Sequence, residues 1–239
     1  MITRKLVALI VIVLYLSFSG TASQGLSPEE SVALKDHLWW AEALLKDITP
    51  AATSYVHNRD YSGVAWKGAL NSTARSNTDC SGFMDEIFVH TYGFTPNYMK
   101  KWLGGKSRPS ASSYYGAIAD QRGFHNIKKI RDAKPGDIIA VYYPFDRENT
   151  GHVMLIAAAP ENVRPGKPFV EGTAQWRVKV IDSSRSPHWK EDTRWNKGVE
   201  YGGLGKGSLR LYSNEKGEVT GYTWSLGVNR RAKLTHLRP

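Results

Sequence analysis

Cys80 is the residue with the clearest chemical potential, because it is the only cysteine in a chain of 239 residues. It lies in the segment 79–83, Asp-Cys-Ser-Gly-Phe, between a polar stretch at 63–78 and an amphipathic run at 83–90. This order predicts a loop that leads into a helix, with the thiol in the first turn. The positive end of a helix favours the nucleophilic thiolate and can stabilise an oxyanion. The alternative is a buried cysteine that packs as a small apolar side chain.

A cysteine that hydrolyses amides needs a base within hydrogen-bonding reach. Of the seven histidines, His152 is the best placed, because it follows Gly151 at the start of an apolar strand. His90 lies too far along the predicted helix to meet the thiol of Cys80, and no orienting group is evident near His125. The alternative for His152 is a histidine with a structural role only.

The base in turn needs a third group that orients it. Asp182 ends the strand that follows His152, and its carboxylate is expected to accept the Nδ1–H of that ring. His188 and Ser183 are alternative third residues. An aspartate at this position can also simply cap a turn.

The elements that must position these residues are helical in the first half of the chain and extended in the second. Ser27 and Pro28 are typical of a helix start, and Pro50 stops the same helix. Polar or Pro/Gly-rich insertions interrupt the pattern at 58–78, 160–172 and 183–207. We expect an α+β fold with N-terminal helices packed on an antiparallel sheet, the helices at 26–48, 80–90, 94–102 and 112–121, and the strands at 124–130, 138–143, 151–157, 177–182, 207–212 and 221–224.

Residues 1–23 resemble a secretory signal peptide. Arg4 and Lys5 supply the charged start, residues 6–18 the apolar region and residues 19–23 the small side chains for cleavage. The apolar region is shorter than the roughly 20 residues of a membrane-spanning helix, although an uncleaved anchor is the alternative. We therefore expect a secreted or periplasmic bacterial protein, with 24–239 as a single catalytic domain that carries loop insertions and no membrane span after cleavage.

The net charge of +10 favours polyanionic partners. For an exported protein, an anionic envelope polymer or membrane surface is expected rather than nucleic acid, for which no basic-aromatic motif is present. The alternative is that the charge only maintains solubility. One cysteine and scattered histidines give no metal-ligand spacing, so neither a metal nor a cofactor is expected.

Three segments in order resemble the NlpC/P60 family of papain-like cysteine hydrolases. They are 79–83, then 134–139 (Lys-Pro-Gly-Asp-Ile-Ile), then 151–153 (Gly-His-Val), within a match over about 55–182. The resemblance implies a cysteine that opens the catalytic helix, a histidine that opens a strand, and metal-free cleavage of amide bonds in bacterial cell-wall peptides, often beside a D-amino acid. The chain departs from the family at Asp182, where His, Asn or Gln is usual.

The leading interpretation is an exported cysteine amidase or endopeptidase that acts on peptidoglycan peptides through Cys80, His152 and Asp182. Two further roles complete the predicted site. The N–H of Cys80 and the side chain of Tyr55 hold the oxyanion, and Asp79 and Ser81 bind an amine of the substrate. The alternatives are a non-catalytic wall-binding module on the same scaffold and a cysteine-dependent acyltransferase.

Overall fold

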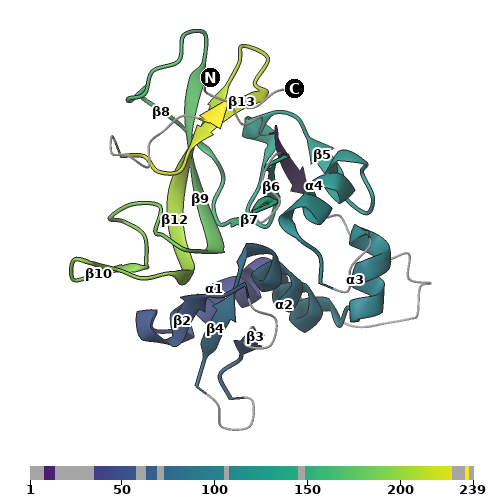
Figure 1. The fold of residues 1–239 in the computed structure, drawn as a ribbon. Helices are drawn as coiled ribbons and strands as arrows, with labels where there is room; N and C mark the ends of the chain where they lie inside the picture. The colour runs from purple at the N-terminus through teal and green to yellow at the C-terminus, as the bar shows by residue number, and fades with distance from the viewer. Residues whose placement is uncertain are drawn as a thin grey trace, which may run out of the picture.

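A large curled antiparallel sheet and a group of helices dominate the fold (Figure 1). This arrangement is α+β, as predicted. The computed structural model describes residues 8–13, 35–57, 63–68, 73–104, 108–144, 149–227 and 235–236.

Within the described ranges, the large sheet has nine strands in the order β14-β13-β12-β9-β7-β6-β1-β5, with β8 paired to β9. Neighbouring strands run antiparallel. The long pair β9 and β12 forms one wall of the sheet, and Asp182 lies opposite Gly205 in its register. The strands are β1 (Ala8–Val13), β5 (His125–Ile127), β6 (Ile138–Tyr142), β7 (Gly151–Ile156), β8 (Glu161–Val163), β9 (Ala174–Ser184), β12 (Gly203–Ser213), β13 (Val219–Thr223) and β14 (Thr235–His236).

β1 falls within the stretch predicted to be the apolar part of a signal peptide. Its backbone pairs with β6 on one side and with β5 on the other. The rest of 1–23 lies outside the described residues, so the signal peptide stays a prediction.

The helices begin at side chains that can accept backbone N–H groups. Asp36 caps α1, Asp79 caps α2 and Thr95 caps α3, as polar N-cap residues commonly do. Gly93 ends α2 in the left-handed conformation, with φ of 68°. The α-helices in the described part of the chain are α1 (His37–Asp47), α2 (Cys80–Tyr92), α3 (Pro96–Leu103) and α4 (Ala111–Ala119), and short 3₁₀ turns there are η1 (Pro50–Ala52) and η4 (Ile130–Asp132).

The predicted start of the first helix is wrong for the described residues, because α1 begins at His37. Lys35 and Asp36 are not helical, and the carboxylate of Asp36 accepts the N–H of Trp39 at 2.7 Å. This bond caps the helix at His37, because it satisfies a donor that would otherwise need a preceding turn. The predicted cap at Ser27 lies outside the described residues.

The polar stretch 58–78 is not a loop throughout, contrary to prediction. It contains β3 (Gly63–Ala65) and β4 (Arg75–Thr78), which join β2 (Thr53–Tyr55) in a small sheet in the order β2-β4-β3. The two strands, Gly-Val-Ala and Arg-Ser-Asn-Thr, are too short to show the apolar alternation that would predict them. β2 lies parallel to β4 and pairs Tyr55 with Thr78, which brings Tyr55 close to the start of α2.

The insertions at 160–172 and 183–207 also contain strands. β8 lies in the first of them, and the second contains β10 (Trp195–Asn196) and β11 (Val199–Glu200). β9 continues to Ser184 and β12 begins at Gly203, so the second insertion is shorter than predicted.

The turn at 134–137 links the helices to the sheet. The carboxylate of Asp137 accepts the N–H of Lys134 at 2.6 Å and Gly136 has φ of 93°, a conformation that glycine adopts without strain. His37, on α1, donates from Nε2 to the carbonyl of Gly136 at 2.7 Å and accepts from Tyr92 on α2 at 2.6 Å. The predicted tight turn is therefore confirmed, and a buried histidine fastens it to two helices.

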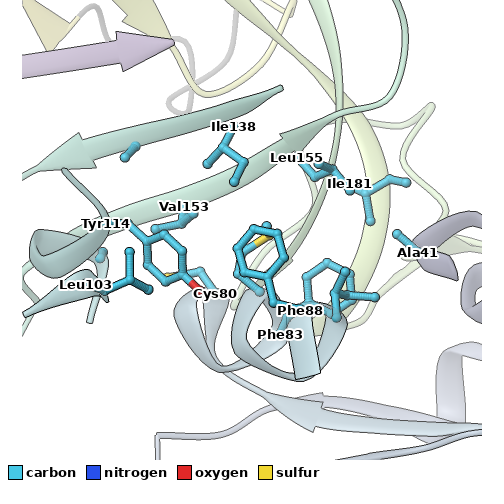
Figure 2. Packing of buried hydrophobic residues seen from close by; sticks show 14 of the residues in the cluster. Ala41, Cys80, Phe83, Phe88, Leu103, Tyr114, Ile138, Val153, Leu155 and Ile181 are labelled. Atoms are coloured by element: carbon cyan, nitrogen blue, oxygen red, sulfur yellow. The ribbon is translucent and has the colours of Figure 1, made fainter. Parts of the chain in front are cut away.

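The sheet is buried on both faces, because alternate residues of its central strands enter two apolar clusters. Ile138 and Val153 face the helices, whereas Ile139 and Met154 enter the second cluster, together with residues of β9 and β12. Figure 2 shows α2 beneath the sheet, with Cys80 and Phe88 among the side chains of the first cluster. The catalytic candidate is thus built into the main helix–sheet interface.

Candidate active site

Cys80 is the first residue of α2 and is only 5% exposed. The preceding Asp79 accepts the N–H of Gly82 at 2.6 Å through Oδ1 and so closes the first turn. The sequence-based placement of the thiol at a helix N-terminus is confirmed. Its sulfur therefore lies at the positive end of the helix dipole, where a thiolate is stabilised.

His152, the second residue of β7, joins Cys80 to Asp182. Its Nε2 lies 2.6 Å from Oδ2 of Asp182, and the imidazole is near enough to the side chain of Cys80 for that side chain to raise its pKa. Since Nε2 of His152 binds Asp182, Nδ1 is the ring nitrogen that is left to face the sulfur of Cys80. The expectation that Asp182 binds Nδ1 is therefore wrong, because the ring reaches from one strand to the next with its Nε2 side toward β9.

The charge on His152 follows from these contacts. Burial alone would lower the pKa of the imidazole, but a thiolate on Cys80 and the carboxylate of Asp182 outweigh burial and raise the pKa of His152 to about 10. At neutral pH the ring is therefore an imidazolium beside the carboxylate of Asp182. It can donate one proton toward the sulfur and one toward the carboxylate.

Asp182 lies on β9, the neighbour of β7. The two strands pair at Leu155–Ile181 and Ile156–Val180, and beyond this ladder the His152–Asp182 hydrogen bond connects them through side chains. Asp182 is fully buried. Burial alone would raise its pKa, but Arg194 and the two histidines hold the pKa well below the ordinary value of a carboxyl. Asp182 is thus a permanent anion behind His152.

His188 and Ser183, the alternatives to Asp182 as the third residue, bind partners other than His152. His188 lies behind Asp182, with Nε2 3.2 Å from Oδ1 and Nδ1 2.8 Å from the carbonyl oxygen of Trp224. Ser183 donates to the carbonyl of Thr78 at 2.6 Å and so ties β9 to β4. Asp182 is therefore the candidate third residue that binds His152.

Arg194 binds the carboxylate of Asp182. No role was predicted for this arginine from the sequence. It is 1% exposed and donates to Oδ1 of Asp182 at 2.9 Å. It also binds Asp192 at 2.9 and 2.7 Å, the side chain of Ser184, and the carbonyl of Gly203 at 3.1 Å. A buried guanidinium with two carboxylates is compensated both in charge and in hydrogen bonds. The arrangement fixes the carboxylate that binds His152.

Alternate glycines of β12 make room for this buried network. Gly205 lies opposite Asp182 in the register, so a side chain there would project to the same face. A Cβ on Gly205 would lie 2.6 Å from Cγ and Cδ of Arg194, and one on Gly207 would lie 2.9 Å from Cβ of His188. The glycines at 205 and 207 are the sequence signal that could have indicated bulky buried side chains packed against this strand.

Gly205→Ala is expected to lower the free energy of unfolding by about 1–3 kcal/mol, because Arg194 cannot yield without breaking buried ion pairs. Gly63→Ala is the matched control, since a Cβ there would meet no atom within 4 Å, and its effect should stay within about 1 kcal/mol. Denaturant unfolding of both variants measures the difference. Equal effects would contradict the proposed packing.

A cavity of about 520 Å³ opens over the site. His152, Gly151, Tyr55, Tyr143 and Trp224 contribute to its walls. Burial, followed by the charge of a Cys80 thiolate, raises the pKa of the Tyr55 phenol above its ordinary value, and burial likewise raises that of Tyr143. Both phenols therefore keep their protons and present O–H groups near the sulfur.

Tyr55 therefore lies in the wall of the cavity beside His152, and its role as an oxyanion donor stays a prediction. Tyr143 and Trp224 were not found from the sequence. Tyr143 follows a buried strand and shares a 2.9 Å hydrogen bond with Tyr222, and the ring of Trp224 stands edge-on to that of His152 at 5.0 Å. Because they come from segments far from Cys80 in sequence, no local pattern relates them to it.

Asp79 and Ser81, predicted to bind a substrate amine, are engaged in the start of the helix. Oδ1 of Asp79 accepts the hydroxyl of Ser81 at 3.2 Å as well as Gly82 N–H, and lies 3.8 Å from Arg108. Its Oδ2 lies 3.2 Å from Nδ1 of His57. Ser81 itself is buried. Their role in substrate binding stays a prediction.

The described residues show neither a metal-binding cluster nor a membrane-spanning helix. No group of three or more His, Cys, Asp and Glu side chains within these ranges is placed to hold a metal ion. None of the helices described has both the length and the apolar character needed to cross a bilayer.

The raised pKa of His152 gives a direct test of its contact with Cys80. In Cys80→Ala, removal of the thiolate is expected to lower this pKa by about one pH unit or more. Histidine NMR titrations measure it, with exposed His125 as the resonance that should not change between the proteins. Because the folded pKa is raised from 6.5 to about 10, the stabilisation from His152 is fully present below pH 6.5 and is lost as the pH rises through 10. An unchanged titration would contradict the contact.

Comparison with known proteins gives a viral relative. The chain is 35% identical over 206 residues to a protein of Acanthamoeba polyphaga mimivirus named "Uncharacterized protein R653", and the alignment covers 81% of this chain and 89% of that protein. Neither a protein-family model nor a solved structure matches the chain.

Proposed function

We propose that this chain, which belongs to the same family as the mimivirus uncharacterized protein R653, is a cysteine hydrolase of amide bonds. One observation carries the proposal. The imidazole of His152 bridges Cys80 at a helix N-terminus and the buried carboxylate of Asp182, at the edge of a cavity. A nucleophile, a base and an orienting group in contact are the constellation that acyl transfer requires.

The proposed reaction has two steps. The Cys80 thiolate attacks the amide carbonyl, and the oxyanion that forms is held by N–H groups of the first turn of α2 and by the hydroxyl of Tyr55. His152 then gives a proton to the leaving amine, and the C–N bond breaks to leave a thioester. In the second step His152 takes a proton from water, which attacks the thioester and releases a carboxylate and Cys80.

Asp182 does not exchange protons in this scheme. Its carboxylate stays ionised because Arg194 and His188 surround it. It holds the imidazole in the orientation that directs Nδ1 to the sulfur, and it stabilises the imidazolium.

The proposal extends to the fold family and to the substrate. The order of a cysteine-bearing helix, a Pro-Gly-Asp turn and a strand opened by histidine supports a papain-like fold of the NlpC/P60 type, and with it peptide amides of the bacterial cell wall as substrate. The basic composition of the chain suits an anionic polymer of this kind. Export to the envelope is part of the same proposal.

Mass spectrometry of peptidoglycan fragments after incubation with the purified protein tests the reaction and the substrate together. The expected result is a new amine and a new carboxylate at one amide bond. Cleavage of an unrelated peptide library, with no change in the wall fragments, would contradict the proposed substrate but support amide hydrolysis. No cleavage of either material would contradict the hydrolase.

A further inference from the structure

The cavity that His152 lines continues beyond Tyr55. A second cavity of about 460 Å³ shares Tyr55, His57 and Arg185 with the first. A substrate that lies against His152 in the first cavity can therefore extend past these three side chains into the second. Groups at this junction are placed to select what lies beside the scissile bond.

Arg185 is the fixed positive charge at this junction. Its guanidinium carbon lies 5.6 Å from the centre of the Tyr55 ring. The residues that line the two cavities include no aspartate or glutamate, and the described part of the chain provides no acidic partner for Arg185. Arginine that is stacked on a ring and free of carboxylates has its planar donors available to a ligand.

The backbone that presents Arg185 is held firmly. Ser184 ends β9, and its hydroxyl donates to the carbonyl of Ser186 at 2.8 Å, which closes the turn around Arg185. The same hydroxyl accepts from buried Arg194. The turn is thus tied to the network that orients Asp182, so the backbone that carries the exposed Arg185 side chain is held in place relative to the reacting groups.

The charges nearby favour an anion over a cation. The imidazolium of His152 faces the first cavity, and His57 lies beside Tyr55 with ring centres 4.9 Å apart. The nearby carboxylate, that of Asp79, is paired with the helix start and with His57. A substrate ammonium would meet positive charge here, whereas a carboxylate would meet a guanidinium.

We propose that Arg185 binds a carboxylate of the substrate, so that the enzyme prefers amide bonds close to an acidic side chain or to a free C-terminal carboxylate. The proposal rests on the proposed hydrolase. It identifies Arg185 as a specificity residue and replaces the predicted selection of a substrate amine by Asp79 and Ser81. Two N–H groups of the guanidinium match the two oxygens of a carboxylate, which gives directional as well as electrostatic selection.

Binding to the Cys80→Ala protein tests this inference without any turnover. The probes are alanine-based pentapeptides with one Glu or Gln moved through each position, each made with a C-terminal acid and a C-terminal amide. We expect the carboxylate member of at least one pair to bind about 10- to 100-fold more tightly by calorimetry. The Glu/Gln and acid/amide arms distinguish a side-chain carboxylate from a terminal one.

Arg185→Ala in the same background should abolish that preference. Arg185→Lys should retain only part of it, because lysine lacks the planar pair of N–H donors of a guanidinium. Arg177→Ala is the control: Arg177 lies on β9, the strand that precedes Arg185, its side chain is 44% exposed and pairs with Glu161, and its loss should leave the preference unchanged. Equal Kd values within every pair, or a preference that survives in Arg185→Ala, would overturn the inference. Since hydrolysis is measured separately, either result is distinguishable from a failure of the hydrolase proposal.

Discussion

Cys80→Ala is expected to lower the turnover of the amide substrate by roughly 10⁴- to 10⁶-fold, because no other described side chain at His152 can act as the nucleophile. The fold should persist. The thiol is a small part of the first apolar cluster, and the cap at Asp79 does not use it. Product release followed by chromatography measures turnover, and circular dichroism checks the fold.

Cys80→Ser is the matched variant for this prediction. It keeps the shape of the side chain, but a hydroxyl loses its proton far less readily than a thiol. It should therefore be nearly as inactive as Cys80→Ala. Turnover within about tenfold of the wild type in either folded variant would remove Cys80 from the mechanism.

Arg194→Met should produce the largest loss of stability among single substitutions outside the apolar core. Arg194 neutralises Asp182 and Asp192, both of which are buried. Removal of one partner from a buried ion pair leaves a charge without compensation, and the expected cost is about 3–5 kcal/mol of unfolding free energy. Denaturant unfolding monitored by tryptophan fluorescence measures it.

Arg177→Met is the control, because its ion pair with Glu161 is exposed and should contribute less than about 1 kcal/mol. The variant Asp192→Asn should restore part of the stability lost in Arg194→Met, since one uncompensated charge is removed. A double-mutant cycle gives the coupling. Equal costs for Arg194→Met and Arg177→Met would mean that the buried network does not hold the site.

The parts of this fold that the sequence predicts well are those with local signals. Asp79 and Gly93 delimit α2 through a side-chain cap and a left-handed glycine, and both are common helix boundaries. β6 and β7 are apolar runs next to turn residues. These elements carry Cys80 and His152, so two members of the site could be located from local pattern alone.

The rest depends on contacts between distant segments. β3 and β4 are only three and four residues long, so only the neighbouring strand identifies them. The network around Arg194 joins β9, β12 and the segment between them. The glycines of β12 are the sequence feature that reflects this network, but their meaning is clear only once the strand register is known. For the same reason the ring nitrogen that faces Asp182 could not be assigned in advance.

The central claim is that Cys80 carries the acyl group of the substrate with the help of His152. Intact-mass spectrometry of an acid-quenched reaction with an activated peptide ester tests it, because such esters make thioester hydrolysis the slow step and the intermediate accumulates. The account predicts a mass increase equal to the acyl group, located on the fragment that contains Cys80, and its absence in His152→Ala. Product formation without this adduct, or an adduct formed equally well in His152→Ala, would contradict the account.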